Sequence, residues 1–154
     1  MTSTGYYELD RLPAKCAANY IYDEKQNNYR TNIFSVDAKG TGAGGAFTTV
    51  NDIKLFWYHL LSGKLLSAEM TANMISNHSG ESQCYGYGIW LRKDEKNFIP
   101  YFQGNDPGVS FISCYDIQKK LLVVLVSNYG DNVWQLLKEI TKHYTKNEYD
   151  VYLS

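Results

Sequence analysis

The apolar residues in the middle of the chain recur at the spacing of one face of an amphipathic helix. Thr49 is a candidate N-cap, with Asp52 three residues later in a capping-box-like spacing. Ser62-Gly63 predicts the end of this helix. The apolar face that it would bury consists of Ile53, Phe56, Trp57, Leu60 and Leu61.

Two further helices are expected on the same grounds. One covers residues 66–76 with Ser67 as its N-cap, and the other begins at Asp131 or Asn132 near the end of the chain. The first has the inward-facing residues Met70, Met74 and Ile75. A methionine-containing stripe of this kind is more typical of a packed core than of a cofactor site. The stripe of the last helix consists of Val133, Leu136, Leu137, Ile140 and Tyr144.

Between these helices the hydrophobic period changes to that of strands. Extended segments are expected over residues 84–93, 97–104, 109–116 and 120–128, and shorter ones at 18–23 and 32–36. The polar turn "DIQKK" predicts an antiparallel hairpin between the last two long strands. Every residue over 121–126 is apolar, so both faces of that strand should be covered. The fold class expected is α+β, an antiparallel β-meander of three or four strands flanked by helices.

Residues 39–49, "KGTGAGGAFTT", contain four glycines. Such a stretch either cradles a phosphate or allows two backbone segments to pass closely. A phosphate loop would require a preceding strand and a terminal Gly-Lys-Ser/Thr, and neither is convincing. Close backbone passage is therefore the favoured interpretation.

Composition and charge exclude several classes of function. The 154 residues suffice for one compact domain, and the net charge of −1, without a basic cluster, argues against nucleic-acid binding. No apolar run reaches the length of a membrane-spanning helix. Three cysteines and three histidines, all dispersed, favour neither a disulfide framework nor a metal site; His78 with Cys84 is a remote metal alternative. No metal or cofactor is expected.

The order of motifs resembles the C-terminal half of the serine β-lactamase and penicillin-binding-protein-like hydrolases, in their class C and esterase branch. The resemblance is carried by "GTGAGGAFTTVNDIKLFWYHLLSGKLLSAEMTANM", "YGYGIWL" and "GNDPGVSFISCYDIQKKLLVVLVSN". The opening "MTSTGYY" is similar to a stretch that lies mid-domain in the family, so Met1 would be an internal residue. Residues 1–144 would be the C-terminal portion of a β-lactamase/transpeptidase-like domain, and 145–154 a tail of unknown role.

The resemblance implies nucleophilic acyl transfer by a serine of Ser-x-x-Lys, assisted by a Tyr-x-Asn or Ser-x-Asn element. Neither element occurs in this chain, so no catalytic residue is assigned. "KGTG" (39–42) mimics the family's third motif, Lys-Thr-Gly, but lies in the glycine-rich stretch instead of on a strand.

Counting back from the "DPG" turn, the third motif falls on Phe102, Gln103 and Gly104. Asn105 would then supply the oxyanion N–H. Phe102 stands where a cation or imidazole is expected, which indicates an altered substrate-binding strand. A turn that merely ends one strand and begins another explains the same residues equally well.

The expected function is therefore the C-terminal fragment of a serine hydrolase acting on an amide, β-lactam or ester, inactive by itself. The alternative is a non-catalytic assembly or binding module, either a homodimer or a half-domain that docks a missing N-terminal half. A retained groove would take a small acyl or peptide-like ligand. The chain would be cytoplasmic if Met1 is a true start, and secreted or cell-surface if it belongs to a longer parent.

Overall fold

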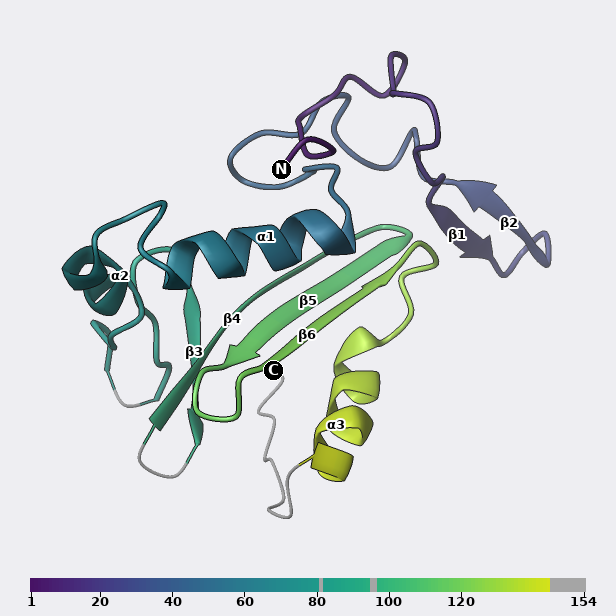
Figure 1. The fold of residues 1–154 in the computed structure, drawn as a ribbon. Coiled ribbons are helices and arrows are strands. Elements are labelled where there is room, and N and C mark those ends of the chain that lie inside the picture. The colour runs from purple at the N-terminus through teal and green to yellow at the C-terminus, as the bar shows by residue number, and fades with distance from the viewer. Residues whose placement is uncertain (81, 95–96, 145–154) are drawn as a thin grey trace.

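The computed structural model describes residues 1–80, 82–94 and 97–144, with side chains to Lys142. Its elements follow the order β1, β2, α1, α2, β3, β4, β5, β6 and α3 (Figure 1). None of the helices in this part of the chain is long and apolar enough to cross a bilayer. The element bounds are β1 Tyr20–Asp23, β2 Asn28–Thr31, α1 Val50–Leu61, α2 Ala68–Met74, β3 Trp90–Asp94, β4 Asn97–Asp106, β5 Val109–Asp116, β6 Leu121–Ser127 and α3 Val133–Tyr144.

The expected α+β class and meander are confirmed. Strands β3, β4, β5 and β6 form one antiparallel sheet in that order, and β1 pairs with β2 in a separate hairpin. Residues 109–116, expected as a strand, coincide with β5, and the "DIQKK" segment connects β5 to β6 as an antiparallel hairpin.

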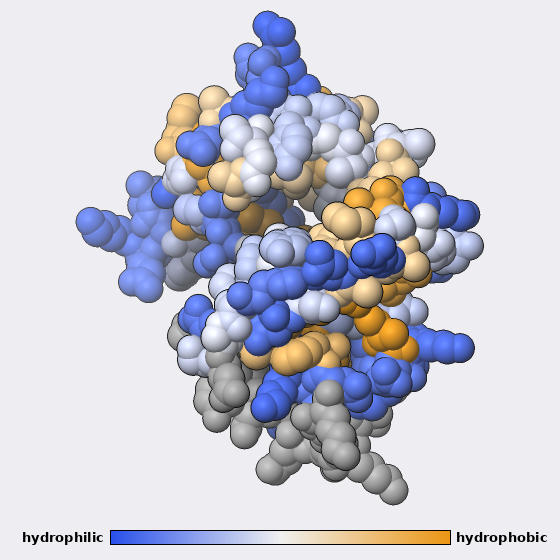
Figure 2. Space-filling view, turned by 90° about the vertical axis from the view of Figure 1, so that its left-hand side faces the viewer, coloured by the Kyte–Doolittle hydropathy of each residue, from blue (hydrophilic) through white to orange (hydrophobic). Residues whose placement is uncertain are grey.

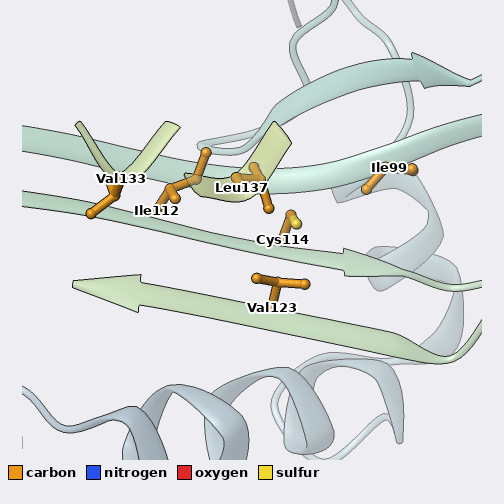
Figure 3. Packing of buried hydrophobic residues seen from close by; sticks show 6 residues of the cluster. All are labelled: Ile99, Ile112, Cys114, Val123, Val133 and Leu137. Atoms are coloured by element: carbon orange, nitrogen blue, oxygen red, sulfur yellow. The ribbon is translucent and has the colours of Figure 1, made fainter. Parts of the chain in front are cut away.

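Helices cover both faces of the sheet (Figure 1), as the apolar run of β6 predicted, but Val126 at the end of that run is 58% exposed. On one face, Val133 and Leu137 of α3 pack against Ile112, Cys114 and Val123 (Figure 3). On the other face, the buried residues of α1 pack with alternate side chains of the same strands. That second cluster includes Ile53, Trp57, Leu60, Phe102, Phe111, Tyr115, Leu122 and Val124.

The expected N-caps Thr49 and Ser67 are confirmed. Of the two residues expected to cap the last helix, the structure shows which one does so. Thr49 Oγ1 accepts the Asp52 N–H at 3.1 Å, and Ser67 Oγ accepts the Met70 N–H at 3.1 Å. Asn132 Oδ1 accepts the Gln135 N–H at 3.0 Å, so Asn132 caps the last helix instead of Asp131. The reciprocal half of a capping box is not formed at α1, because the Asp52 carboxylate binds Ser3 and Thr4.

The glycine-rich stretch brings two backbone segments together, as its composition indicated. A Cβ on Gly40 would lie 2.2 Å from the carbonyl oxygen of Gly45, and Gly45 itself has a φ of +79°. Thr41 and Gly44 exchange backbone hydrogen bonds across this turn. Glycine is required here because a side chain at either position would separate the segments.

Two expected strands are corrected by the structure. Residues 32–36 form a turn, and the partner of β1 is Asn28–Thr31, because Asn27 with φ +51° closes a tight hairpin before that segment. The strand expected over 84–93 begins only at Trp90. Before it, Gly86 packs directly on the backbone of Met74, and Gly88 adopts a φ of +72°, which turns the chain.

Two residues expected in the core lie on the surface. Met70 is 52% exposed because α2 has only seven residues and buries a different face, through Thr71, with Met74 and Ile75 partly buried. Leu136 is 50% exposed, since the side of α3 that meets the sheet is centred on Val133 and Leu137. The side chain of Tyr144 lies outside the described residues. The side of the molecule that carries α2 shows apolar side chains interspersed with polar ones (Figure 2).

Candidate functional site

Strand β4 carries all four candidate residues in the stretch that leads into the β4–β5 turn. Side chains alternate between the two faces of a strand, so Phe102 and Gly104 face the α1 side of the sheet. Gln103 and Asn105 face the α3 side by the same alternation. The four positions therefore form a strip along the strand and do not converge on one point.

Phe102 belongs to the aromatic core beneath α1. Its ring centroid lies 5.6 Å from that of Phe56, 5.5 Å from that of Trp57 and 5.5 Å from that of Phe111. The Trp57 indole is fully buried and donates a hydrogen bond to the equally buried Ser113 hydroxyl at 2.8 Å. The side chain at the position of the expected cation is thus a packing residue.

Gln103 is exposed on the opposite face, where α3 fixes it. Its Oε1 atom accepts a hydrogen bond from the Trp134 indole Nε1 at 2.6 Å. The sequence does not predict this role of Trp134, because its partner lies 31 positions earlier in the chain and no local pattern links the two residues. The contact fixes the orientation of the side-chain amide beside the strand.

Gly104 and Asn105, near the end of β4, are exposed to solvent. A Cβ built on Gly104 would meet no heavy atom within 4 Å. Neither Phe102 nor the three residues after it has an ionisable side chain. Chemistry at this strip therefore depends on the backbone and on two side-chain amides.

The outer edge of β4 is free after Tyr101, which pairs with Trp90, the first residue of β3. Strand β3 pairs with β4 only from Asn97 to Tyr101, whereas β5 pairs with β4 as far as Asp106. The hairpin closures at Asp94–Asn97 and at Asp106–Val109 place the hydrogen-bonded pairs at alternate residues. Both closures direct the backbone N–H and C=O groups of Gln103 and Asn105 toward the free edge. The described residues include no backbone hydrogen-bond partner for this edge.

The turn after β4 has a clear structural role. Pro107 precedes Gly108, whose φ of +80° is the left-handed conformation that the second turn position requires. A Cβ on Gly108 would lie 2.8 Å from the Tyr20 carbonyl oxygen, and Asn32 Nδ2 donates to the Pro107 carbonyl at 2.9 Å. The next serine, Ser110, is buried and donates to the Asp131 carbonyl. The "DPGVS" stretch therefore joins the β1–β2 hairpin, the sheet and the start of α3.

Two ionisable groups close to the strip have altered pKa values. Burial raises the pKa of Tyr101, opposed by the nearby Arg92 guanidinium. Burial likewise raises the pKa of the Cys114 thiol on β5. Both groups are therefore neutral at pH 7, and neither is poised as a nucleophile or base.

Neither of two surface hollows includes the strip. One of ≈450 Å³ lies beside Glu8, Ile33 and Lys39, and one of ≈400 Å³ lies between α2 and the β5–β6 turn. In the ranges 1–80, 82–94 and 97–144 no three His, Cys, Asp or Glu residues are arranged to hold a metal ion. His78 instead stacks on Tyr87, with 4.1 Å between their ring centroids.

The four-stranded antiparallel meander between α1 and α3 matches the C-terminal half of a β-lactamase and penicillin-binding-protein-like fold, which confirms the resemblance seen in the sequence. It superimposes on the crystal structure of a penicillin-binding protein from Bacillus halodurans with a TM-score of 0.84 and 29% sequence identity, covering 91% of this chain and 44% of that one.

A second solved structure, FmtA from Staphylococcus aureus, shares the fold at a TM-score of 0.69 and 21% identity. The match covers 94% of this chain and 39% of the FmtA chain. The chain thus spans less than half the length of either protein. No protein-family model matches the sequence, and no curated protein matches it.

Proposed function

We propose that this chain is the C-terminal part of a serine hydrolase that transfers or hydrolyses an acyl group of an amide, β-lactam or ester. The observation that carries the proposal is the match over 91% of the chain to a penicillin-binding protein at a TM-score of 0.84. The identity of 29%, together with the shared motif order, makes descent from such a protein a stronger explanation than chance similarity of fold.

The part of the site that this chain contributes is the free edge of β4, from Phe102 to Asn105. The outward N–H of Asn105 would stabilise the oxyanion, and the backbone of Gln103 would pair with an extended acyl or peptide-like substrate. The Trp134–Gln103 hydrogen bond supports a fixed geometry of this edge. Because Phe102 is uncharged and packs in the core, substrate binding depends on backbone pairing instead of on a cation.

The chain by itself should not catalyse acyl transfer. No serine is followed three residues later by lysine, and Tyr-x-Asn and Ser-x-Asn are absent from all 154 residues. A site that lacks its nucleophile and base retains only the weak catalysis of transition-state binding. The nucleophile and its activating groups would lie on an N-terminal segment, encoded upstream or supplied by another chain.

The first test is the DNA sequence upstream of the Met1 codon. An in-frame extension that encodes Ser-x-x-Lys followed by Tyr-x-Asn is expected. The extended protein should then form a covalent adduct with a fluorescent penicillin or an activated ester, whereas residues 1–154 alone should not. Labelling of residues 1–154 alone would contradict the proposal, as would an extended protein that has both elements and forms no adduct with either class of reagent.

A non-catalytic assembly role is the second candidate, favoured by the edge of β6. Within the described residues no strand pairs with the outer side of Leu121–Ser127, and Val126 there is 58% exposed. An open apolar edge strand commonly pairs with another chain. Sedimentation of residues 1–154 should show a dimer under this hypothesis, and a monomer if the edge of β6 pairs with an N-terminal segment instead.

A third outcome is thermal stabilisation of residues 1–154 by a β-lactam or an acylated peptide, which would favour a retained ligand groove.

A further inference from the structure

Four tyrosines, three on the β1–β2 hairpin and one after β6, form a contiguous aromatic surface outside both core clusters. Tyr22 pairs with Tyr29 across the hairpin, and Tyr20 lies two residues from Tyr22 on the same face. Tyr129, from the connection between β6 and α3, extends the row. These residues, Tyr20, Tyr22, Tyr29 and Tyr129, are called the tyrosine face below.

The rings of the tyrosine face form a row in space, in which each ring contacts the next. Tyr20 stacks on Tyr129 at 5.4 Å between centroids, Tyr129 meets the edge of Tyr29 at 5.3 Å, and Tyr29 lies 5.2 Å from Tyr22. Tyr22, Tyr29 and Tyr129 are 48%, 57% and 48% exposed. The hairpin projects from the rest of the described chain (Figure 1).

Attachment of the hairpin explains only part of this arrangement. The Tyr20 N–H donates to the Asn128 carbonyl at 2.8 Å, and the Asn128 amide donates to the Ala18 carbonyl at 2.9 Å. With the Asn32 bond to Pro107, these contacts hold the base of the hairpin by hydrogen bonds. Tyr22 and Tyr29 lie toward the tip and belong to neither core cluster. Aromatic area left exposed in a contiguous patch is typical of a binding surface.

The chemistry of the face indicates the class of ligand. Charged residues of the hairpin strands, Asp23 and Arg30, lie on its other face by strand alternation. Asp23 binds the turn backbone, and Arg30 reaches Ser35. The tyrosine face is therefore uncharged, with flat rings and hydroxyl groups and no aliphatic side chain.

We propose that the tyrosine face binds an uncharged oligosaccharide. The C–H faces of a sugar ring stack on aromatic rings, and its hydroxyls can exchange hydrogen bonds with the phenol groups and with Thr31, which shares this face. The Tyr22 hydroxyl already donates a hydrogen bond to Asn27 Oδ1, but a purely aliphatic partner would bury the hydroxyls of Tyr29 and Tyr129 without partners, which is costly. This activity is independent of the acyl chemistry proposed for β4.

The test is titration of residues 1–154 with neutral hexasaccharides of β-1,4-linked N-acetylglucosamine and of β-1,4-linked glucose, followed by amide chemical-shift mapping. At least one should bind saturably, with shift changes confined to the hairpin and to residues near Tyr129. Replacing Tyr22 or Tyr29 by Ala should weaken binding roughly three- to tenfold, the effect of one lost aromatic contact. Tyr29→Phe, which keeps the ring, should retain most of the affinity and is a cleaner variant than Tyr22→Phe, which also removes the hydrogen bond from Tyr22 to Asn27 Oδ1.

The matched control is Tyr87→Ala, since Tyr87 is 58% exposed but stacks on His78 in another part of the chain. Its affinity should equal that of the unchanged protein. No saturable binding of either sugar would overturn the proposal, as would binding that Tyr22→Ala and Tyr29→Ala leave unchanged. Preferential binding of a proline-rich peptide at the same residues would also overturn it, because that result would identify a protein partner.

Discussion

The Thr4 hydroxyl donates a hydrogen bond to the Asp52 carboxylate at 2.7 Å, although 48 positions separate the two residues. The same carboxylate accepts the Ser3 backbone N–H at 2.9 Å. Asp52 lies in the first turn of α1, where a negative charge is also favoured by the helix dipole. This contact ties the N-terminal segment to the helix that covers one face of the sheet.

Acid should weaken this connection. The Thr4 hydroxyl, with a smaller contribution from the Ser3 N–H, lowers the pKa of Asp52 below its ordinary value of 3.8, against the opposing effect of burial. A carboxyl with a lowered pKa in the folded state stabilises that state above pH 3.8, and the contribution is lost as the pH falls through the folded-state pKa. Thermal unfolding followed from pH 6 downward should show this loss. Asp52→Asn should be less stable at pH 6 and should vary less with pH in the acid range. An unchanged pH profile in Asp52→Asn would contradict the assignment.

Removal of the buried Ser113 hydroxyl should destabilise the fold. Ser113→Ala leaves the fully buried Trp57 indole N–H without its partner, and such a loss costs about 1–3 kcal/mol. Urea unfolding measures this change in the free energy of unfolding. Ser82→Ala, at an exposed serine, is the control and should stay within about 0.5 kcal/mol. The double variant Trp57→Phe with Ser113→Ala should lose less than the sum of the single variants, because the two groups form one bond. Strict additivity would contradict the pairing.

A cation introduced at Phe102 should destabilise the fold and should not restore a ligand-binding charge. Phe102→Lys removes a ring packed against Phe56, Trp57 and Phe111 and places a charge beside them, so a loss of about 2–4 kcal/mol is expected. Asn105→Lys, on the same strand but exposed, should change stability by only about 0.5 kcal/mol. Equal stability of these two variants in urea would show that Phe102 is not a core residue.

Substitution by alanine should destabilise the fold at only one of the two glycines that flank the "NDP" segment. Gly108→Ala combines a φ of +80° with a close approach to the Tyr20 carbonyl, so a loss of about 2 kcal/mol or more is expected. Gly104→Ala meets open space at ordinary φ and should change stability by about 0.5 kcal/mol or less. Calorimetric melting of both variants decides the matter. A neutral Gly108→Ala would mean that the hairpin does not pack on this turn as described.

The order of motifs located the candidate strip on β4, but only the structure shows where its side chains and backbone groups point. The sequence placed Phe102 where a cation was expected and could not say where its side chain lies. The three ring contacts decide that it packs in the core. The two hairpin closures set the direction of the Gln103 and Asn105 backbone groups, and these groups lack a strand partner because β3 begins only at Trp90, which pairs with Tyr101. No feature of residues 102–105 specifies where β3 begins.

What the sequence determined by itself is set by local periodicity and local chemistry. The helix over residues 50–61, the strands within 97–128 and the caps at Thr49 and Ser67 were readable because each depends on side chains a few residues apart. The tertiary structure alone decided the exposure of Met70 and Leu136, the Thr4–Asp52 and Trp134–Gln103 bonds, and the tyrosine face. The exposures depend on which side of each helix meets the rest of the molecule, and the contacts join segments far apart in the chain, so neither can be read from residues a few positions apart.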